Sequence, residues 1–380
     1  MKKILFGIIA TTFIMTGCSN NNLKVSSETT QKITWTVGGN LDAPTGFTKQ
    51  HGVAGPLAGN INNKIIIAGG ANFPYKSVLE GGAKKHYPDL YVLEEKNGKL
   101  ETINHQLLKQ ETGYGSTVST ENGIYYIGGA NDSGISNKIY HLTLTKDNKI
   151  NVHEIGELPF TYFGGTIAIK NNILYIVNGK HNGKDSNDFY SYNLITKETK
   201  KLPNYPGEAR SQSVGQILNN GQSDAFYVFS GGSNIAYTDG FAYNFNTNKW
   251  EKVNSVKVNN KEISLLGASS VKLNNNELLV IGGFNKEVYD NAVKNLSTLK
   301  DKQLQNFKEK YFTTDPQDFN WNKNILIYNA KDNTWKSIGE VPFNAPCGEG
   351  LVLIGNKLYS INGEIKPGVR TEKMYIGTIN

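Results

Sequence analysis

The sequence predicts an all-β protein, a six-bladed β-propeller whose ring closes across the two chain termini. Three observations predict this fold. A strand-like apolar segment ending in Gly-Gly or Asn-Gly recurs six times, a tyrosine-rich strand follows each pair, and a tryptophan strand missing from the last repeat is found at the N-terminal end. Each blade of a propeller buries its faces against neighbouring blades, so a chain of 380 residues can form one ring.

Residues 1–17 precede the repeats and have the organisation of a secretory signal peptide. A basic pair is followed by an apolar run and then by Thr16-Gly17-Cys18. These residues resemble the lipobox of bacterial lipoproteins, and the resemblance implies cleavage before Cys18 and attachment of lipid to it. An ordinary signal peptide with a chance cysteine is the alternative. The first interpretation predicts an exported cell-envelope lipoprotein, periplasmic or membrane-anchored.

The rest of the chain divides into a tether and the propeller. Residues 18–32 are polar and are expected to form a flexible tether, whereas residues 33–380 carry the repeats. The one other cysteine is Cys347, so a lipid on Cys18 would leave the fold without disulfides. No later segment is long and apolar enough to span a bilayer, and we expect membrane contact through the lipid anchor only.

Glycine pairs define the six repeats. The first residues of successive pairs are separated by 59, 50, 53, 51 and 80 residues. The continuous apolar segments before the pairs suit strands that are buried on both faces, and glycine allows backbone angles that a side chain forbids. The pairs begin at Gly69, Gly128, Asn178, Gly231, Gly282 and Asn362.

Tryptophan strands complete the repeats and suggest how the ring closes. Trp250 and Trp335 follow the tyrosine-rich strands of the fourth and fifth units, whereas the sixth unit ends without such a strand. The strand around Trp35 can supply it, and Gly38-Gly39 is then not the end of a seventh blade. The whole pattern resembles the kelch repeat over nearly all of the chain after the signal peptide. The tyrosine-rich strands contain Tyr91, Tyr140, Tyr190, Tyr243, Tyr328 and Tyr375.

The last, longest separation contains an insertion in the fifth blade. Between about residues 286 and 320, apolar residues recur at near-helical intervals, which predicts one or two amphipathic helices. The insertion is either a lid over the central channel or an element packed on the rim.

The sixth unit departs from the others after its Asn-Gly pair. Residues 362–371 read Asn-Gly-Glu-Ile-Lys-Pro-Gly-Val-Arg-Thr, which resembles the signature of the N-acetylneuraminate epimerase (sialic acid mutarotase) family. Residues 51–55, residues 69–73 and the insertion through Tyr311-Phe312 resemble other family segments. In the best-known members this loop lies in the middle of the chain, so the sequence resembles a cyclically permuted branch. The resemblance implies an isomerase that interconverts anomers of sialic acid or a related sugar without a cofactor.

Glu364 and Arg370 are the candidate catalytic residues. Opening and reclosing a sugar ring requires a base for the anomeric hydroxyl proton and an acid for the ring oxygen. Arginine offers a planar fork that matches the carboxylate of a sugar acid. By the resemblance, Glu364 is the proton-transfer residue and Arg370 is the carboxylate or transition-state partner. A structural salt bridge that stiffens the loop is the alternative.

Two further patterns give candidate substrate-binding residues. Two residues after the glycine pair, four units have asparagine and the third unit has His181. If the blades are superposable, these side chains form a partial ring at one mouth of the channel, where they could hydrogen-bond a sugar. Asparagine is also common in turns, which is the alternative explanation. Arg210 starts an inner strand of the fourth unit and either contacts substrate or links two blades. The four asparagines are Asn72, Asn131, Asn234 and Asn285.

The sequence gives less support to other classes of function. The net charge is +7, but the basic residues form no run, which argues against a nucleic-acid partner. A mild positive charge suits a small anionic partner. A sialidase would carry Asp-box motifs, and the sequence has none. A kelch copper oxidase would need histidine ligands that converge on a metal, and the six histidines have no metal-like spacing, so we expect no metal. The main alternative is a non-catalytic kelch-propeller lipoprotein that binds glycans or proteins, against which only the Glu364–Arg370 loop argues.

Overall fold

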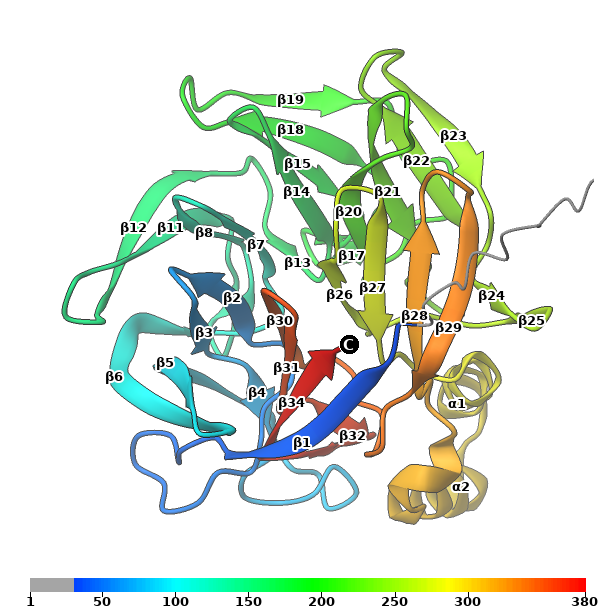
Figure 1. The fold of residues 1–380 in the computed structure, drawn as a ribbon. Coiled ribbons are helices and arrows are strands. Elements are labelled where there is room, and N and C mark those ends of the chain that lie inside the picture. Colours follow the sequence, from blue (N-terminus) through cyan, green and yellow to red (C-terminus); the bar gives the residue numbers. More distant parts are fainter. Residues whose placement is uncertain (1–30) are drawn as a thin grey trace, which may run out of the picture. The chain divides into compact units, whose positions relative to one another are not determined.

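A computed structural model describes residues 31–380 of the chain. The predicted signal peptide, Cys18 and most of the predicted tether lie outside these residues. The described part consists mainly of antiparallel sheets, with two α-helices and a short 3-10 helix (Figure 1). Among residues 31–380 no helix is long and apolar enough to cross a membrane.

Six of the sheets contain four or five antiparallel strands and follow one another along the chain. The first contains β2 (Leu57–Ile61), β3 (Lys64–Ala68), β5 (Lys85–Lys96) and β6 (Lys99–Thr112), with β4 (Ala71–Asn72) paired to β5. The second contains β7 (Ser116–Thr120), β8 (Gly123–Ile127), β11 (Lys138–Leu144) and β12 (Ile150–Glu157). The third contains β14 (Thr166–Lys170), β15 (Ile173–Val177), β18 (Phe189–Asn193) and β19 (Thr199–Leu202).

The fourth and fifth sheets repeat this arrangement. The fourth contains β20 (Val214–Asn219), β21 (Asp224–Phe229), β22 (Gly240–Asn244) and β23 (Lys249–Val253). The fifth contains β26 (Ser269–Lys272), β27 (Glu277–Ile281), β28 (Asn324–Asn329) and β29 (Thr334–Glu340). The predicted glycine pairs therefore follow the second strand of these sheets, directly except in the fourth, where Ser230 lies between β21 and Gly231.

The sixth sheet joins the two ends of the described chain. Its order is β1 (Ile33–Asn40), β34 (Lys373–Ile379), β31 (Lys357–Ile361) and β30 (Gly350–Ile354). Trp35 lies on the outer strand opposite Gly377, and its ring packs edge-on against Phe343 with 5.2 Å between ring centroids. Gly38 and Gly39 lie inside β1 at a bulge in its pairing, so they do not end a further sheet.

Short hairpins follow the glycine pairs or connect the sheets. Their strands are two or three residues long and pair only locally. They are β9 (Ala130–Asn131) with β10 (Gly134–Ile135), β13 (Tyr162–Phe163) with β16 (Lys180–His181) and β17 (Lys184–Asp185), β24 (Lys257–Val258) with β25 (Lys261–Glu262), and β32 (Glu364–Lys366) with β33 (Val369–Arg370).

Apolar side chains fill the space between each sheet and the next. Each of six buried clusters combines residues from two consecutive sheets, and one of them joins the sixth sheet to the first. In that cluster, Ile67 and Tyr91 of the first sheet pack with Val352 and Tyr359 of the sixth. Truncation of one buried Leu or Ile to Ala typically costs about 2–5 kcal/mol, so these clusters are the main source of cohesion.

A ring of backbone hydrogen bonds links the innermost strands. A residue with positive φ lies two positions before the first residue of each innermost strand. Its N–H donates to the carbonyl of the residue at the same position in the preceding sheet. The N–H of Tyr114 donates to Gly55 at 2.6 Å, and the N–H of Gly55 donates to Gly348 at 2.7 Å, so the series returns to its start. The six members are Gly55, Tyr114, Gly164, Gln212, Gly267 and Gly348.

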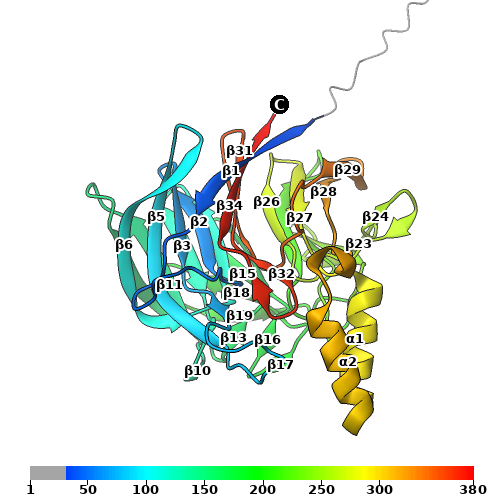
Figure 2. The ribbon, with the colours of Figure 1, turned by 90° about the horizontal axis from the view of Figure 1, so that it is seen from below.

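The insertion in the fifth sheet is helical. It contains α1 (Lys286–Thr298), α2 (Asp301–Thr313) and the 3-10 helix η1 (Pro316–Phe319), between β27 and β28. Figures 1 and 2 show α1 and α2 away from the innermost strands, at the outside of the fifth sheet. Val288 and Tyr311 of these helices pack on the apolar cluster between the fifth and sixth sheets. The insertion therefore packs at the rim and also contacts the β32–β33 hairpin, because Nζ of Lys366 donates to the carbonyl of Thr314 at 2.8 Å.

Candidate active site

The Glu364–Arg370 segment forms a hairpin between the second and third strands of the sixth sheet. β32 and β33 pair so that Glu364 lies opposite Arg370. Gly368 has a φ of +83°, and its N–H donates a 2.7 Å hydrogen bond to Oε1 of Glu364, so the turn positions the carboxylate. The backbone of Glu364 also pairs with that of Cys347, which fixes the hairpin against the segment leading into β30.

The guanidinium of Arg370 is buried but has uncommitted donors. Its Nη1 lies 3.3 Å from Oε1 of Glu364, which makes an ion pair without the geometry of a hydrogen bond. Within residues 31–380, Nη1 and Nε have no hydrogen-bond partner. The guanidinium lies over the ring of Phe73 at 4.9 Å. Because buried donors normally have partners, these N–H groups are available to an anion such as a carboxylate.

The charge of Glu364 acts on two side chains whose pKa is already raised by burial. Burial, and then the negative charge of Glu364, raise the pKa of Tyr311 above its usual range. Burial raises the pKa of the Cys347 thiol well above its usual range, with smaller contributions from Glu364 and Glu349. Within the described chain, Arg370 is the one basic residue that forms an ion pair with Glu364. The hairpin therefore has one positive group next to its carboxylate.

Glu349 is an acidic residue of this region that the sequence analysis missed. A Cβ placed on Gly363 would lie 2.9 Å from the Cβ of Glu349, so this residue packs directly behind the hairpin. Both carboxylate oxygens are buried without a hydrogen-bond partner in residues 31–380, and burial raises the pKa to about 8. Aligning the six repeats would have found Glu349, because the equivalent residues are Pro56, Gly115, Gly165, Ser213 and Ala268.

Arg210 makes all of its described contacts within the protein. It is fully buried and forms a bidentate ion pair with Asp239, with Nη2 3.1 Å from Oδ2. Its Nε and Nη1 donate to the carbonyls of Glu208 and Ser230, and its guanidinium stacks on Tyr237 at 4.0 Å. Because its own backbone pairs with the hairpin of the third sheet, these contacts support the structural alternative, a link between sheets.

The four predicted asparagines have different local environments. Asn72 is buried, donates to a backbone carbonyl at 2.6 Å and accepts from a tyrosine hydroxyl at 2.7 Å. Asn131 accepts two N–H groups of its own turn, Asn285 caps α1, and Asn234 is exposed. His181, in the third unit, stacks on an aromatic ring. Turn and capping roles therefore account for Asn131 and Asn285, and the four amides do not share one environment.

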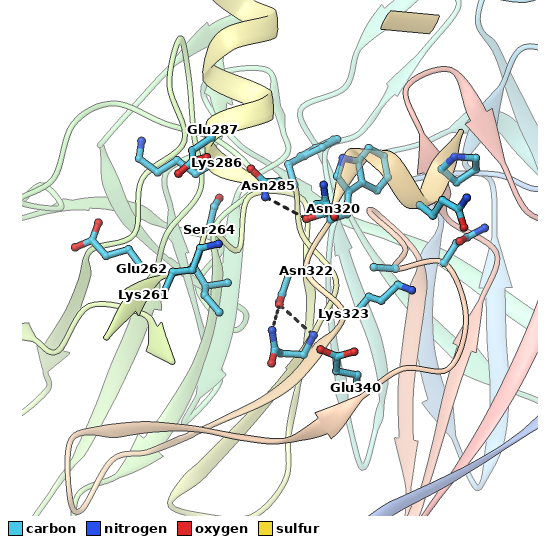
Figure 3. A pocket seen from close by; sticks show the side chains of 18 residues that line it. Lys261, Glu262, Ser264, Asn285, Lys286, Glu287, Asn320, Asn322, Lys323 and Glu340 are labelled. Atoms are coloured by element: carbon cyan, nitrogen blue, oxygen red, sulfur yellow. Dashed lines mark hydrogen bonds between the residues drawn. The ribbon is translucent and has the colours of Figure 1, made fainter. Parts of the chain in front are cut away.

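Two surface cavities lie away from the hairpin. The first, of about 530 Å³, lies between the β24–β25 hairpin and the helical insertion, and Asn285 is the only predicted site residue in its lining (Figure 3). A second of about 550 Å³ includes Asn234. Neither is lined by Glu364 or Arg370, and the first has no net charge. Its charged residues are Lys261, Lys286, Lys323, Glu262, Glu287 and Glu340.

Six sheets are built on one repeat, and a hairpin of the last carries a glutamate beside a buried arginine. These features define a mostly β repeat protein with a candidate site at that hairpin. The family model of N-acetylneuraminate epimerase matches residues 7–152 and 155–380. The chain therefore belongs to the N-acetylneuraminate epimerase family, which is a family of isomerases. The resemblance found in the sequence is confirmed.

Individual relatives match part of the chain. The N-acetylneuraminate epimerase of Salmonella typhi is 33% identical over 229 residues, which cover 58% of this chain and 56% of the relative. That of Vibrio cholerae serotype O1 is 30% identical over 195 residues, 48% of each chain. The chain thus spans about half the length of the curated relatives it matches. A solved structure described as "Structure of YjhT" matches with a TM-score of 0.51 and 24% identity over 60% of this chain and 67% of that one, which shows a similar fold.

Proposed function

We propose that this protein interconverts the α and β anomers of N-acetylneuraminate, or of a closely related sugar acid, by general acid–base catalysis. One observation carries the proposal: a buried guanidinium with two uncommitted donor nitrogens lies beside a partly exposed carboxylate. A salt bridge that served only the fold would use those donors internally, as Arg210 does. Membership of the epimerase family supports the same assignment.

Glu364 is the base in this proposal. Its carboxylate takes the proton of the anomeric hydroxyl while the bond between the anomeric carbon and the ring oxygen breaks, and an acid protonates the ring oxygen. Rotation about the neighbouring carbon–carbon bond then exposes the other face of the new carbonyl. Ring closure reverses both proton transfers, so the cycle consumes no proton, oxidant or cofactor.

Arg370 holds the substrate carboxylate. In a sialic acid the carboxylate is attached to the anomeric carbon itself, so an arginine that binds it also places the anomeric hydroxyl. Because Glu364 and Arg370 pair across one hairpin, binding and proton transfer take place at the same carbon. The fixed fork of arginine suits a carboxylate better than the point charge of lysine.

We also propose that the six sheets are the blades of a kelch-type propeller closed across the termini. The pairing of β1 with β34, the apolar cluster between the sixth and first sheets, and the returning series of backbone hydrogen bonds support closure. Closure removes free sheet edges and holds the hairpins that follow the glycine pairs around one mouth.

The proposal for the N-terminal segment is export and lipidation at Cys18, which make the protein an envelope lipoprotein. We expect Cys18→Ala to move the protein from the membrane fraction to the soluble fraction, because the lipid is its only proposed anchor. Fractionation of cells that express each form measures this, with Cys347→Ala as the matched control. An unchanged membrane fraction of Cys18→Ala would contradict lipidation at this residue.

Proton NMR exchange spectroscopy tests the activity. Purified protein is expected to accelerate exchange between the anomers of N-acetylneuraminate well above the spontaneous rate at neutral pH. N-acetylmannosamine, which lacks the carboxylate, is the matched control, and its exchange should be accelerated much less. If no sugar acid exchanges faster with the protein than without it, the proposed activity is wrong and a non-catalytic binding role is favoured.

A further inference from the structure

His86 occupies in the first sheet the position that Arg370 occupies in the sixth. In each sheet the residue directly after the glycine pair is matched across a hairpin: Ala71 pairs with His86, and Glu364 pairs with Arg370. The two sheets are neighbours, because β30 contacts β2. Both side chains are nearly buried, with 8% exposure for His86 and 7% for Arg370. The repeat therefore places an imidazole and the guanidinium at equivalent points of adjacent sheets.

A row of side chains connects these two points. The guanidinium of Arg370 lies over Phe73, and Lys84 Nζ lies 5.9 Å from the centre of the same ring. Lys84 Nζ also lies 4.8 Å from the centre of the Tyr114 ring, which meets the His86 ring edge-on at 6.4 Å. Because Tyr114 belongs to the backbone ring of the innermost strands, the row follows the inner edge of the hairpins.

Asp132 orients the imidazole of His86. Its Oδ1 lies 2.8 Å from Nδ1, and this hydrogen bond is the main cause that lowers the pKa of the Asp132 carboxyl. A carboxylate at Nδ1 fixes the orientation of the ring and directs Nε2 away from the Asp132 contact. Nε2 has no hydrogen-bond partner in residues 31–380 and is not one of their fully buried polar atoms, so it is open to a ligand.

We propose that His86 is a further catalytic residue, the acid that protonates the ring oxygen while Glu364 takes the anomeric proton. This inference rests on the proposed function. In ring opening, the Nε2 proton passes to the ring oxygen as its bond to the anomeric carbon breaks, and Glu364 receives the hydroxyl proton. Ring closure returns both protons, so protons and charge balance over the cycle. Asp132 acts through His86 and is a positioning residue.

A purely structural role makes a different prediction. The His86–Asp132 pair joins the first sheet to the hairpin of the second, so a structural pair would affect stability but not the rate per folded molecule. The chain offers a matched control, because Nε2 of His105 lies 2.9 Å from Oδ1 of Asp89 within the first sheet. His105 stacks on Tyr91 and has no described contact with the row that leads to Arg370.

The experiment compares NMR exchange rates and melting temperatures of the wild type, His86→Gln, His86→Ala, Asp132→Asn and His105→Gln. We expect His86→Gln to lower kcat by about 10²-fold with little change in KM, as removal of one acid–base group does. Added imidazole should restore part of the rate of His86→Ala after subtraction of the rate without protein. Asp132→Asn should lower kcat with KM unchanged, and His105→Gln should keep the wild-type kcat.

The outcomes separate this inference from the proposed function. A wild type that accelerates exchange, together with His86→Gln at the wild-type kcat, would overturn the role of His86 and leave the role of Glu364 intact. If the His86 variants melt at a lower temperature but keep the wild-type kcat and show no imidazole rescue, the His86–Asp132 pair has a structural role only. A wild type without any acceleration would defeat the proposed function itself.

Discussion

Two buried arginines show how surroundings decide what one residue type does. Arg210 has an ion pair with Asp239, two backbone carbonyls and an aromatic face, so its donors are used by the protein. Arg370 has one ion pair of poor hydrogen-bond geometry, and its Nε and Nη1 have no partner in residues 31–380. The donors of the first arginine are satisfied within the fold, whereas two donor nitrogens of the second have no partner among the described residues, as the proposed binding of a carboxylate requires.

Glu349 should make the stability of the protein depend on pH. Burial raises its pKa in the folded state to about 8, above the ordinary 4.5. Between these values the unfolded chain has lost the proton that the folded chain keeps, so the contribution of Glu349 to stability falls as the pH rises through this window. We expect Glu349→Gln, which stays neutral, to melt near the wild type at pH 5 and several degrees higher at pH 8 to 9.

The control for Glu349 is an exposed carboxylate on β29. Glu340→Gln should give the same difference from the wild type at every pH, because solvent keeps that carboxylate hydrated. Thermal unfolding from pH 5 to 9 measures both variants. A constant difference for Glu349→Gln over this range would show that Glu349 is not held protonated.

For single residues, the sequence predicts contacts between residues of the same short motif. Glu364 and Arg370 stand six positions apart in a recognisable segment, and the structure pairs them. The His86–Asp132 pair could not be predicted, because its members come from hairpins of different sheets. Position after the glycine pair did not predict a common environment for the asparagines, because Asn72 bonds to a backbone carbonyl, Asn131 to its own turn and Asn285 to the start of α1.

The central element is the β32–β33 hairpin, whose turn positions the carboxylate of Glu364, the proposed base. Gly368 combines a positive φ with a donated hydrogen bond to Glu364. A Cβ at this position would lie 2.6 Å from a side-chain carbon of Val78. The turn is therefore fixed both by its backbone conformation and by a neighbouring hairpin.

We expect Gly368→Ala to lower kcat by about 10-fold or more, because a small displacement of a catalytic group is costly. Gly355→Ala is the matched control: Gly355 has a φ of +60°, but a Cβ there would meet no atom within 4 Å. It should lose some stability through backbone strain and keep its kcat. Exchange rates and melting temperatures of both variants measure this, and equal kcat values would contradict the positioning role of the turn.

At the scale of elements, strand ends and the helical insertion could be predicted from sequence, whereas short hairpins could not. Glycine pairs mark the ends of the second strands of the six sheets because the turn there requires positive φ, which glycine adopts readily and which Asn178, Ser230 and Asn362 adopt in three of the units. Two-residue strands such as β9 and β10 carry no alternation of apolar and polar residues. Their pairing follows from the turn and from neighbouring sheets.

The whole molecule depends on the strand that brings the two ends together. The seven register pairs between β1 and β34 make the N-terminal residues part of the sixth sheet, which also carries the Glu364 hairpin. The sequence predicted this arrangement from the position of Trp35 relative to Trp250 and Trp335 and from the missing tryptophan strand of the sixth unit. It could not predict the returning ring of backbone hydrogen bonds, which requires positive φ at Tyr114 and Gln212 as well as at glycines.

Removal of β1 should therefore destabilise the whole fold. A variant that starts at Leu41 leaves the edge of β34 without its partner, and a free edge favours association between chains. We expect it to melt at a lower temperature and to aggregate, compared with a variant that starts at Gln31. Thermal unfolding with light scattering measures both, and equal melting temperatures would contradict the role of β1 in the sixth sheet.

The anomer exchange rate of Glu364→Gln, measured by proton NMR on N-acetylneuraminate, tests the proposed role of this residue. Glutamine keeps the size of the side chain and one acceptor but cannot take the hydroxyl proton, so we expect a loss of about 10²–10⁴-fold with the melting temperature preserved. Arg210→Lys, measured in the same two assays, should have a lower melting temperature and an unchanged kcat. A Glu364→Gln protein that exchanges anomers at the wild-type rate would show that Glu364 is not the base.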